Sequence, residues 1–134
     1  MHEFFENNHE RLNSLLDSRS YHEFARLIDQ ANPVDVAEYI DTLTDSRLIT
    51  VFRLLKKDVA AEVFAELGTT AREKIILTTA DSDLAVIIDG LFVDDAVDIL
   101  EELPAIMVKR ILKLSRPETR DLINKFLSYP DESA

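Results

Sequence analysis

The acidic residues between Asp94 and Glu102 are the side chains in this chain best suited to chemistry. Asp94, Asp98 and Glu102 are spaced at i, i+4 and i+8, so on a helix their carboxylates lie along one face. Asp95 and Glu101 add more negative charge, and nothing on this short helix neutralises it. Carboxylates without imidazole or thiolate suit hard cations such as Mg2+ or Ca2+.

Between these two cations, the sequence favours Mg2+. The Asp-x-Asp-x-Asp-Gly loop of a calcium cage is absent, whereas Mg2+ keeps several waters and takes only one or two carboxylates directly. Two carboxylates ~4 Å apart repel by ~1 kcal/mol in water and by ~4 kcal/mol at an effective dielectric of 20. A divalent ion between this surface and a second acidic surface would remove that repulsion. The alternative interpretation is that the charge serves solubility alone.

Several other classes of function are disfavoured by composition. With 26 acidic and 15 basic residues the net charge is -11, which repels the phosphates of nucleic acids. There is no cysteine, and the only glycines, Gly68 and Gly90, cannot form a phosphate-binding or dinucleotide-binding loop. The three histidines, His2, His9 and His22, have no metal-ligand spacing and are predicted to be exposed on helices. The chain is therefore predicted not to be an enzyme. A metal-dependent hydrolase would require carboxylates converging in a cleft.

The elements that must position the acids are short amphipathic helices that recur with a regular period. Similar segments begin at Asp35, Val59, Asp83 and Asp95. Related segments lie midway between the first and second of these, and midway between the second and third. In order along the chain, the segments are Asp35–Leu43, Arg47–Leu55, Val59–Leu67, Ala71–Thr79, Asp83–Leu91, Asp95–Leu103 and Ile106–Leu114. Two further amphipathic segments, His2–Asp17 and Tyr21–Ala31, precede them. Helices of ~10 residues are unstable alone. The sequence therefore predicts an all-α fold, a right-handed superhelix of about ten short helices built from 12-residue repeats.

Local signals predict where several helices begin and which faces are buried. Helix starts are predicted at Asn32-Pro33, and at two capping boxes, Thr70 with Glu73 and Ser115 with Glu118. On the helix that begins near Asp94, the apolar stripe predicted to face the core is Ala96, Ile99, Leu100 and Leu103.

The predicted domain organisation has three parts. Residues 1–19 form an N-terminal helix, residues 20–128 form the superhelical repeat domain, and residues 129–134 begin a linker. Pro130 is expected to stop the last helix. No apolar run approaches the ~20 residues that a membrane span needs, so the fragment itself is predicted to be soluble.

Taken together, these features resemble the cytosolic N-terminal domain of MgtE-type magnesium transporters. The resemblance is carried by the 12-residue helices of the form Asp-x-Ala-x-x-Ile-x-x-Leu, by Ala-Ala-Glu-Val (60–63), by Asp-Asp-Ala-Val-Asp (94–98) and by the exit Tyr-Pro-Asp-Glu-Ser-Ala (129–134). It covers residues from about Tyr21 to Ala134. In that family a pair of CBS domains and a membrane channel follow, usually in a homodimer, at the cytoplasmic face of the cell membrane. The resemblance implies a regulatory domain that docks on CBS domains through bridging Mg2+ and so closes the pore.

The resemblance also implies which residues would face the metal. By position these are Glu62, Asp94 and Asp98, with Asp95 and Glu102 as supporting candidates. The Mg2+ would bind weakly to the isolated domain, because the CBS domains of the same polypeptide or of the dimer mate supply the rest of each site. Contact with the membrane would be made only through the missing transmembrane domain. Glu62 could instead be a solvated surface residue, and Asp94 could act as a helix cap or as first-turn charge.

A second resemblance supports a different function. Related short-helix repeats form the middle region of the flagellar motor switch protein, and Ala31-Asn32-Pro33-Val34 is similar to its Glu-His-Pro-Gln segment only at the proline. This alternative predicts an armadillo-like domain for protein–protein interaction, with no role for metal.

Overall fold

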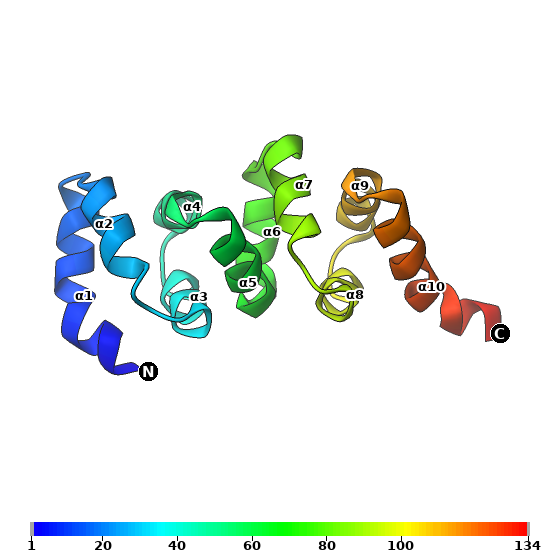
Figure 1. Ribbon diagram of the computed structural model, residues 1–134, viewed down its shortest axis with the longest axis horizontal. Helices are drawn as coiled ribbons and strands as arrows, with labels where there is room; N and C mark the ends of the chain where they lie inside the picture. The colour runs from blue at the N-terminus through cyan, green and yellow to red at the C-terminus, as the bar shows by residue number, and fades with distance from the viewer. Residues whose placement is uncertain (1, 134) are drawn as a thin grey trace.

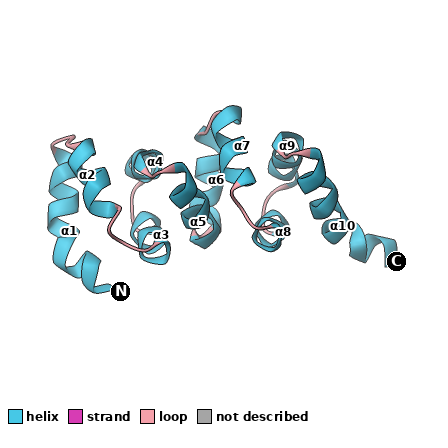
Figure 2. Cartoon of the chain, viewed as in Figure 1, coloured by secondary structure: helices cyan, strands magenta, loops and turns pink. Residues whose placement is uncertain are grey.

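The fold is known from a computed structural model that describes residues 2–133, with side chains described for residues 5–125. This part of the chain forms ten α-helices and no strand (Figure 2). Their bounds are α1 His2–Asp17, α2 Tyr21–Ile28, α3 Pro33–Asp41, α4 Asp45–Leu54, α5 Lys57–Glu66, α6 Thr69–Thr78, α7 Asp81–Asp89, α8 Val93–Glu101, α9 Ala105–Leu114 and α10 Pro117–Ser133. The predicted all-α superhelix of about ten short helices is confirmed.

The helices begin at regular intervals, as the repeat predicted. From Tyr21 at the start of α2 to Pro117 at the start of α10, each first residue follows the previous one by 12 positions. An apolar residue recurs in the turns between helices, where Leu67 and Leu103 are buried and Leu43 and Leu91 pack against the core. These turns are thus held by apolar burial and do not depend on glycine.

The helices pack mainly on their second neighbours along the chain. One row runs α3, α5, α7 and α9, while α4 packs on α6 and α8 packs on α10. The result is an elongated array with α1 at one end and α10 at the other (Figure 1). Its core contains fully buried aromatic and aliphatic side chains, among them Phe24, Ile40, Phe64, Ile75 and Leu84.

The predicted apolar face of α8 is confirmed. Ala96, Ile99, Leu100 and Leu103 are all buried in the common core. Burying the side chain of a leucine or isoleucine stabilises a fold by about 1.5–3 kcal/mol, so this stripe fixes which side of α8 faces solvent. The carboxylates of α8 are left on its outer side.

Ion pairs also join helices that are far apart in sequence. Among the described side chains there are six, each between residues about 27–30 positions apart: Asp17–Arg47, Asp29–Lys56, Asp45–Lys74, Glu102–Arg72, Asp81–Arg110 and Asp89–Arg116. Most have exposed partners and are each worth less than about 1 kcal/mol. The pair between Glu102 and Arg72 differs, because Arg72 is buried.

One of the three predicted helix caps is confirmed. The side chain of Asn32 accepts a hydrogen bond from the backbone N–H of Asp35 at 2.9 Å, and Pro33 is the first residue of α3. Asp35 completes this cap, since its Oδ2 accepts from Asn32 Nδ2 at 3.2 Å.

The two predicted capping boxes are wrong. α6 begins at Thr69 with Gly68 as its N-cap, so Thr70 already lies inside the helix. Ser115 ends α9, and its hydroxyl donates to the carbonyl of Ile111 at 2.8 Å. Both boxes matched the local spacing, but the 12-residue phase of the packed helices decides where each helix begins.

The last helix continues past the point where the sequence predicted its end. α10 runs to Ser133 and so includes Pro130, which was expected to stop it. A proline within a helix removes one backbone hydrogen bond but does not forbid helical dihedrals, since its φ is already near the helical value. The assignment of residues 129–134 to the start of a linker stays a prediction. No helix in the described range of the chain combines the length and the apolar character needed to cross a membrane.

Tyr39 ties α1 to α3 and gives a testable dependence of stability on pH. Its ring stacks on Phe5 with centroids 5.2 Å apart, and its buried hydroxyl donates to Asn13 Oδ1 at 3.2 Å. Burial raises the pKa of Tyr39, and the nearby Arg47 opposes this in part.

A tyrosine whose pKa is raised on folding makes the folded state bind the phenolic proton more tightly than the unfolded state does. Its stabilisation is complete below the usual tyrosine pKa of about 10 and is lost as the pH rises above it. Urea unfolding of Tyr39→Phe should therefore show a shallower loss of stability above pH 10 than the parent protein. Equal slopes in the two proteins would contradict this.

Candidate metal-binding and docking surface

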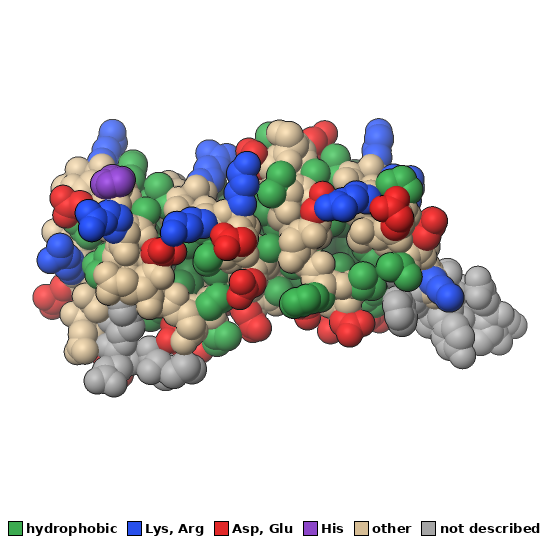
Figure 3. Space-filling view, in the orientation of Figure 1, with side chains coloured by type: hydrophobic (Ala, Val, Ile, Leu, Met, Phe, Trp, Pro, Cys, Tyr) green, Lys and Arg blue, Asp and Glu red, His purple; other side chains and the backbone are tan. Residues whose placement is uncertain are grey.

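The three predicted metal-facing acids lie on two helices that pack together. Glu62 is exposed in the middle of α5, and Asp94 and Asp98 are exposed one turn apart on α8. α5 contacts α8 directly. We call Asp94 and Asp98 the α8 ridge. In Figure 3, acidic side chains gather over the positions of α5 and α8, with hydrophobic side chains between them.

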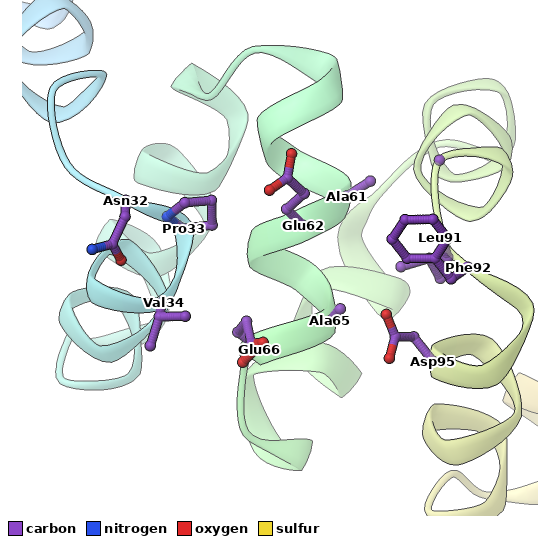
Figure 4. A pocket seen from close by; sticks show the side chains of 11 residues that line it. Asn32, Pro33, Val34, Ala61, Glu62, Ala65, Glu66, Leu91, Phe92 and Asp95 are labelled. Atoms are coloured by element: carbon purple, nitrogen blue, oxygen red, sulfur yellow. The ribbon is translucent and has the colours of Figure 1, made fainter.

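A groove crosses α5, between the start of α3 and the start of α8. We call it the acidic groove; it has a volume of about 330 Å³ and is lined by Asn32, Pro33, Val34, Ala61, Glu62, Ala65, Glu66, Gly90, Leu91, Phe92 and Asp95. In Figure 4, Ala61 and Ala65 project from α5 toward Leu91 and Phe92, while Glu62 and Glu66 lie along α5. Asp95 lies on the α8 side. Glu62 and the supporting candidate Asp95 therefore share one hollow, whereas the α8 ridge lies outside its lining.

The carboxylates of this surface have no internal counter-charge. Glu62, Glu66 and Asp95 form none of the ion pairs or hydrogen bonds found among the described side chains, and the same holds for the α8 ridge. Within the described part of the chain, no group of three or more acidic or histidine side chains could hold a metal ion by itself. The surface can therefore attract cations, but any metal held here would need ligands from elsewhere.

Glu102 does not belong to this surface. The sequence placed it on one helix face with Asp94 and Asp98, but α8 ends at Glu101 and Glu102 is the following cap residue. Its carboxylate accepts from Arg72 Nη1 at 3.3 Å. Arg72 is on α6 and lies 30 positions before Glu102 in the chain. The sequence indicated only that nothing on its own helix neutralises Glu102, and the structure adds a counter-charge from a distant helix, α6.

Arg72 is a structural residue that the sequence did not reveal. It is 8% exposed, and its Nε donates to the carbonyl of Phe64 at 3.0 Å and its Nη2 to that of Ala65 at 2.5 Å. It thus satisfies two carbonyls at the C-terminal end of α5, where helices lack internal donors. With Glu102 as third partner, Arg72 ties together α5, α6 and the end of α8.

An arginine of α10 likewise donates to carbonyls at the end of the preceding helix. Arg120 Nε donates to the carbonyl of Leu112 at 2.9 Å, and its Nη2 donates to that of Ser115 at 3.2 Å. Arg72 and Arg120 are each the fourth residue of their helix. An arginine at the fourth position of a repeat was the signal that could have identified both.

A close approach at Gly90 sets the distance between α5 and α8. Gly90 ends α7 with φ of −83°, a conformation open to any residue, so the glycine is required for space. A Cβ at this position would lie 2.7 Å from the Cβ of Ala61, the neighbour of Glu62. The absence of a side chain lets the turn before α8 rest directly on α5.

Neither His9 nor His22 lines this surface. His9 and His22 are exposed, as predicted, and the ring of His9 meets the edge of Tyr39 with centroids 6.2 Å apart. His2 lies outside the residues whose side chains are described. Among the residues whose side chains the structure describes, every titratable group that lines the acidic groove is a carboxylate.

Comparison with known proteins identifies a family that matches most of the chain. The family described as the MgtE intracellular N domain matches residues 31–132. A solved structure described as the cytosolic domain of the Mg2+ channel MgtE in complex with ATP has a similar fold, with a TM-score of 0.76 and 26% sequence identity. The similarity covers 88% of this chain and 49% of that one, so the chain spans about half the length of its structural relative. No curated protein sequence matches the chain.

Proposed function

This chain belongs to the MgtE intracellular N domain family, and on that premise we propose that it senses Mg2+ as the regulatory cytosolic domain of a magnesium transporter or channel. In this proposal the domain has no catalytic role. It docks on CBS domains of the same polypeptide or of a dimer mate through bridging Mg2+, and docking closes the pore. The domain would act at the cytoplasmic face of the cell membrane, joined to it only through a transmembrane domain outside this chain.

The observation that supports this proposal is the set of unpaired carboxylates on α5 and α8. Glu62, Asp94 and Asp98 are exposed on two packed helices, and the described part of the chain gives none of them a basic partner. A second acidic surface could approach them only if the repulsion between carboxylates were neutralised. That repulsion is ~4 kcal/mol for two carboxylates ~4 Å apart in an effective dielectric of 20. A divalent cation supplies that neutralisation and makes docking depend on its concentration.

The donor chemistry fits Mg2+. Carboxylate oxygens are hard ligands, and Mg2+ commonly binds through one or two carboxylates while it keeps several waters. Glu62, Asp94 and Asp98 would hold the ion from this side, and the remaining ligands would come from water and from the docked domain. When bound, Mg2+ would supply charge neutralisation between the two acidic surfaces.

Titration with Mg2+ tests this proposal. The isolated domain should bind Mg2+ weakly by calorimetry, whereas a longer chain that includes the CBS domains should bind more tightly. The double substitution Asp94→Asn with Asp98→Asn should remove most of the added affinity while leaving the helical circular dichroism unchanged. The matched control is Glu118→Gln with Asp121→Asn, two exposed acids of α10. Equal affinity in the two chains, or an equal loss in the control, would contradict the proposal.

The acidic groove favours a second candidate function, a protein-interaction domain that needs no metal. Phe92 is 79% exposed and Val34 is 41% exposed, and both line this groove. Exposed apolar side chains that share one surface are typical of interaction sites. Under this alternative, docking between the two domains would survive a chelator such as EDTA. Under the magnesium proposal, the chelator would abolish it.

A further inference from the structure

We propose that the acidic groove binds a protein segment in which an apolar side chain is flanked by lysine or arginine. The binding needs no metal ion. The groove would receive the apolar side chain between α5 and the start of α8, and its carboxylates would hold the basic groups on either side. The proposal concerns a surface distinct from the α8 ridge, because Asp94 and Asp98 do not line the groove.

The shape of the acidic groove fits an inserted side chain. Its floor is made by the small residues Ala61, Ala65 and Gly90, so the backbone of α5 can be approached closely. Leu91 and Phe92 form an apolar wall, and Phe92 is the most exposed of the large hydrophobic residues described, at 79%. Covering this wall would remove apolar surface from water, which favours association.

The charges of the acidic groove specify a cationic partner. Its lining includes the carboxylates of Glu62, Glu66 and Asp95 and, within residues 5–125, no lysine, arginine or histidine. In Figure 4, Glu62 and Glu66 lie on the side of α5 toward Pro33 and Val34, and Asp95 lies on the α8 side. A segment with one basic residue before and one after an apolar residue would meet acids on both sides.

Glu62 is the one acid that this inference shares with the magnesium proposal. Around Asp95, the apolar wall favours a basic side chain over Mg2+. Mg2+ keeps several waters, and those waters need hydrogen-bond acceptors that Leu91, Phe92 and the alanine floor do not provide. Lysine and arginine combine an apolar stem with a charged head, so the stem can cover the wall while the head reaches a carboxylate. Arginine can also stack on the ring of Phe92.

Binding of a short peptide to the isolated domain tests the inference. The probe is acetylated and amidated Gly-Lys-Leu-Lys-Gly, titrated into the 15N-labelled domain in EDTA and followed by amide chemical shifts. The controls are the same peptide with serine in place of leucine, and with glutamate in place of both lysines. We expect shifts centred on residues 61–66 and 90–95 for the leucine–lysine peptide, and at least threefold weaker binding for each control peptide.

Substitutions in the domain locate the binding. Phe92→Ala should weaken binding of the leucine–lysine peptide by about tenfold, as expected of an interface anchor. Glu66→Gln should weaken it severalfold and reduce its dependence on salt. The matched controls are Ile106→Ala, an apolar residue that is 77% exposed outside the groove, and Glu118→Gln on α10. Both controls should bind the peptide like the parent.

Three results would overturn the inference. They are equal binding of the serine control peptide, an equal loss in Ile106→Ala, and a loss in Asp94→Asn with Asp98→Asn as large as that in the groove variants. The last of these would assign the peptide to the α8 ridge. Because the assay contains no Mg2+ and no second domain, its outcome is independent of whether magnesium closes a pore.

Discussion

Replacing Arg72 by alanine is expected to lower the free energy of unfolding by about 2–4 kcal/mol, the range for breaking a buried, charge-assisted hydrogen-bond network. The guanidinium of Arg72 satisfies the carbonyls of Phe64 and Ala65 and pairs with Glu102, and its side chain is 10% exposed. Without it, the carbonyl of Ala65 loses its side-chain donor, and that of Phe64 keeps only the longer bond from the backbone N–H of Leu67 at 3.3 Å. Glu102 also loses its counter-charge. Urea unfolding followed by circular dichroism measures the change.

Two further variants separate this network from an ordinary ion pair. Arg72→Lys should recover only part of the loss, because an ammonium group cannot reproduce the planar fork of donors that reaches three acceptors. Arg116→Ala removes an exposed arginine paired with Asp89 at 3.4 Å and should cost less than about 1 kcal/mol. If Arg72→Ala and Arg116→Ala had the same effect, the stabilising role of Arg72 would be wrong.

Replacing Gly90 by alanine is expected to destabilise the domain by about 1–3 kcal/mol, as in other overpacked sites. The new Cβ would lie 2.7 Å from that of Ala61, well inside the separation of about 3.5–4.0 Å at which carbon atoms pack. The start of α8 would have to move away from α5. The variant should therefore also weaken peptide binding in the acidic groove, whose floor includes Gly90.

A compensating substitution tests the cause. Because the clash is between two Cβ atoms, Ala61→Gly should relieve it, and the double variant should be more stable than the sum of the single effects predicts by at least about 1 kcal/mol. Gly68→Ala is the matched control, since its Cβ would lie 3.6 Å from Asp41 Oδ1, an ordinary contact. Additive effects of Gly90→Ala and Ala61→Gly would refute a steric role for Gly90.

The repeat could be predicted because its signal is local. The apolar positions of one 12-residue unit are enough to indicate a helix, and their recurrence indicates stacking, so the helix starts from Tyr21 to Pro117 follow a single phase. The cap at Asn32-Pro33 was equally local. The capping boxes at Thr70 and Ser115 failed because packing of the whole array, which no four-residue pattern records, determines that phase.

Contacts across about 30 positions could not be predicted. The sequence places Glu102 in line with Asp98, but nothing near Glu102 indicates that Arg72 neutralises it from α6. Likewise, Glu62 and Asp95 are 33 positions apart and share one groove only because Gly90 lets the two helices meet. The sequence identified these acids by their residue type. Only the structure shows that Glu62 and Asp95 line the acidic groove, whereas Asp94 and Asp98 form the α8 ridge.

The position of α5 between α3 and α7 has a consequence for docking. In an array where each unit is held by its neighbours, the ends fray first and an internal helix opens only when much of the array opens with it. The two alanines of the groove floor belong to such an internal helix, so this part of the groove is expected to keep its shape when an end helix opens. A ligand would therefore meet a preorganised surface and lose little affinity to the entropy of ordering it.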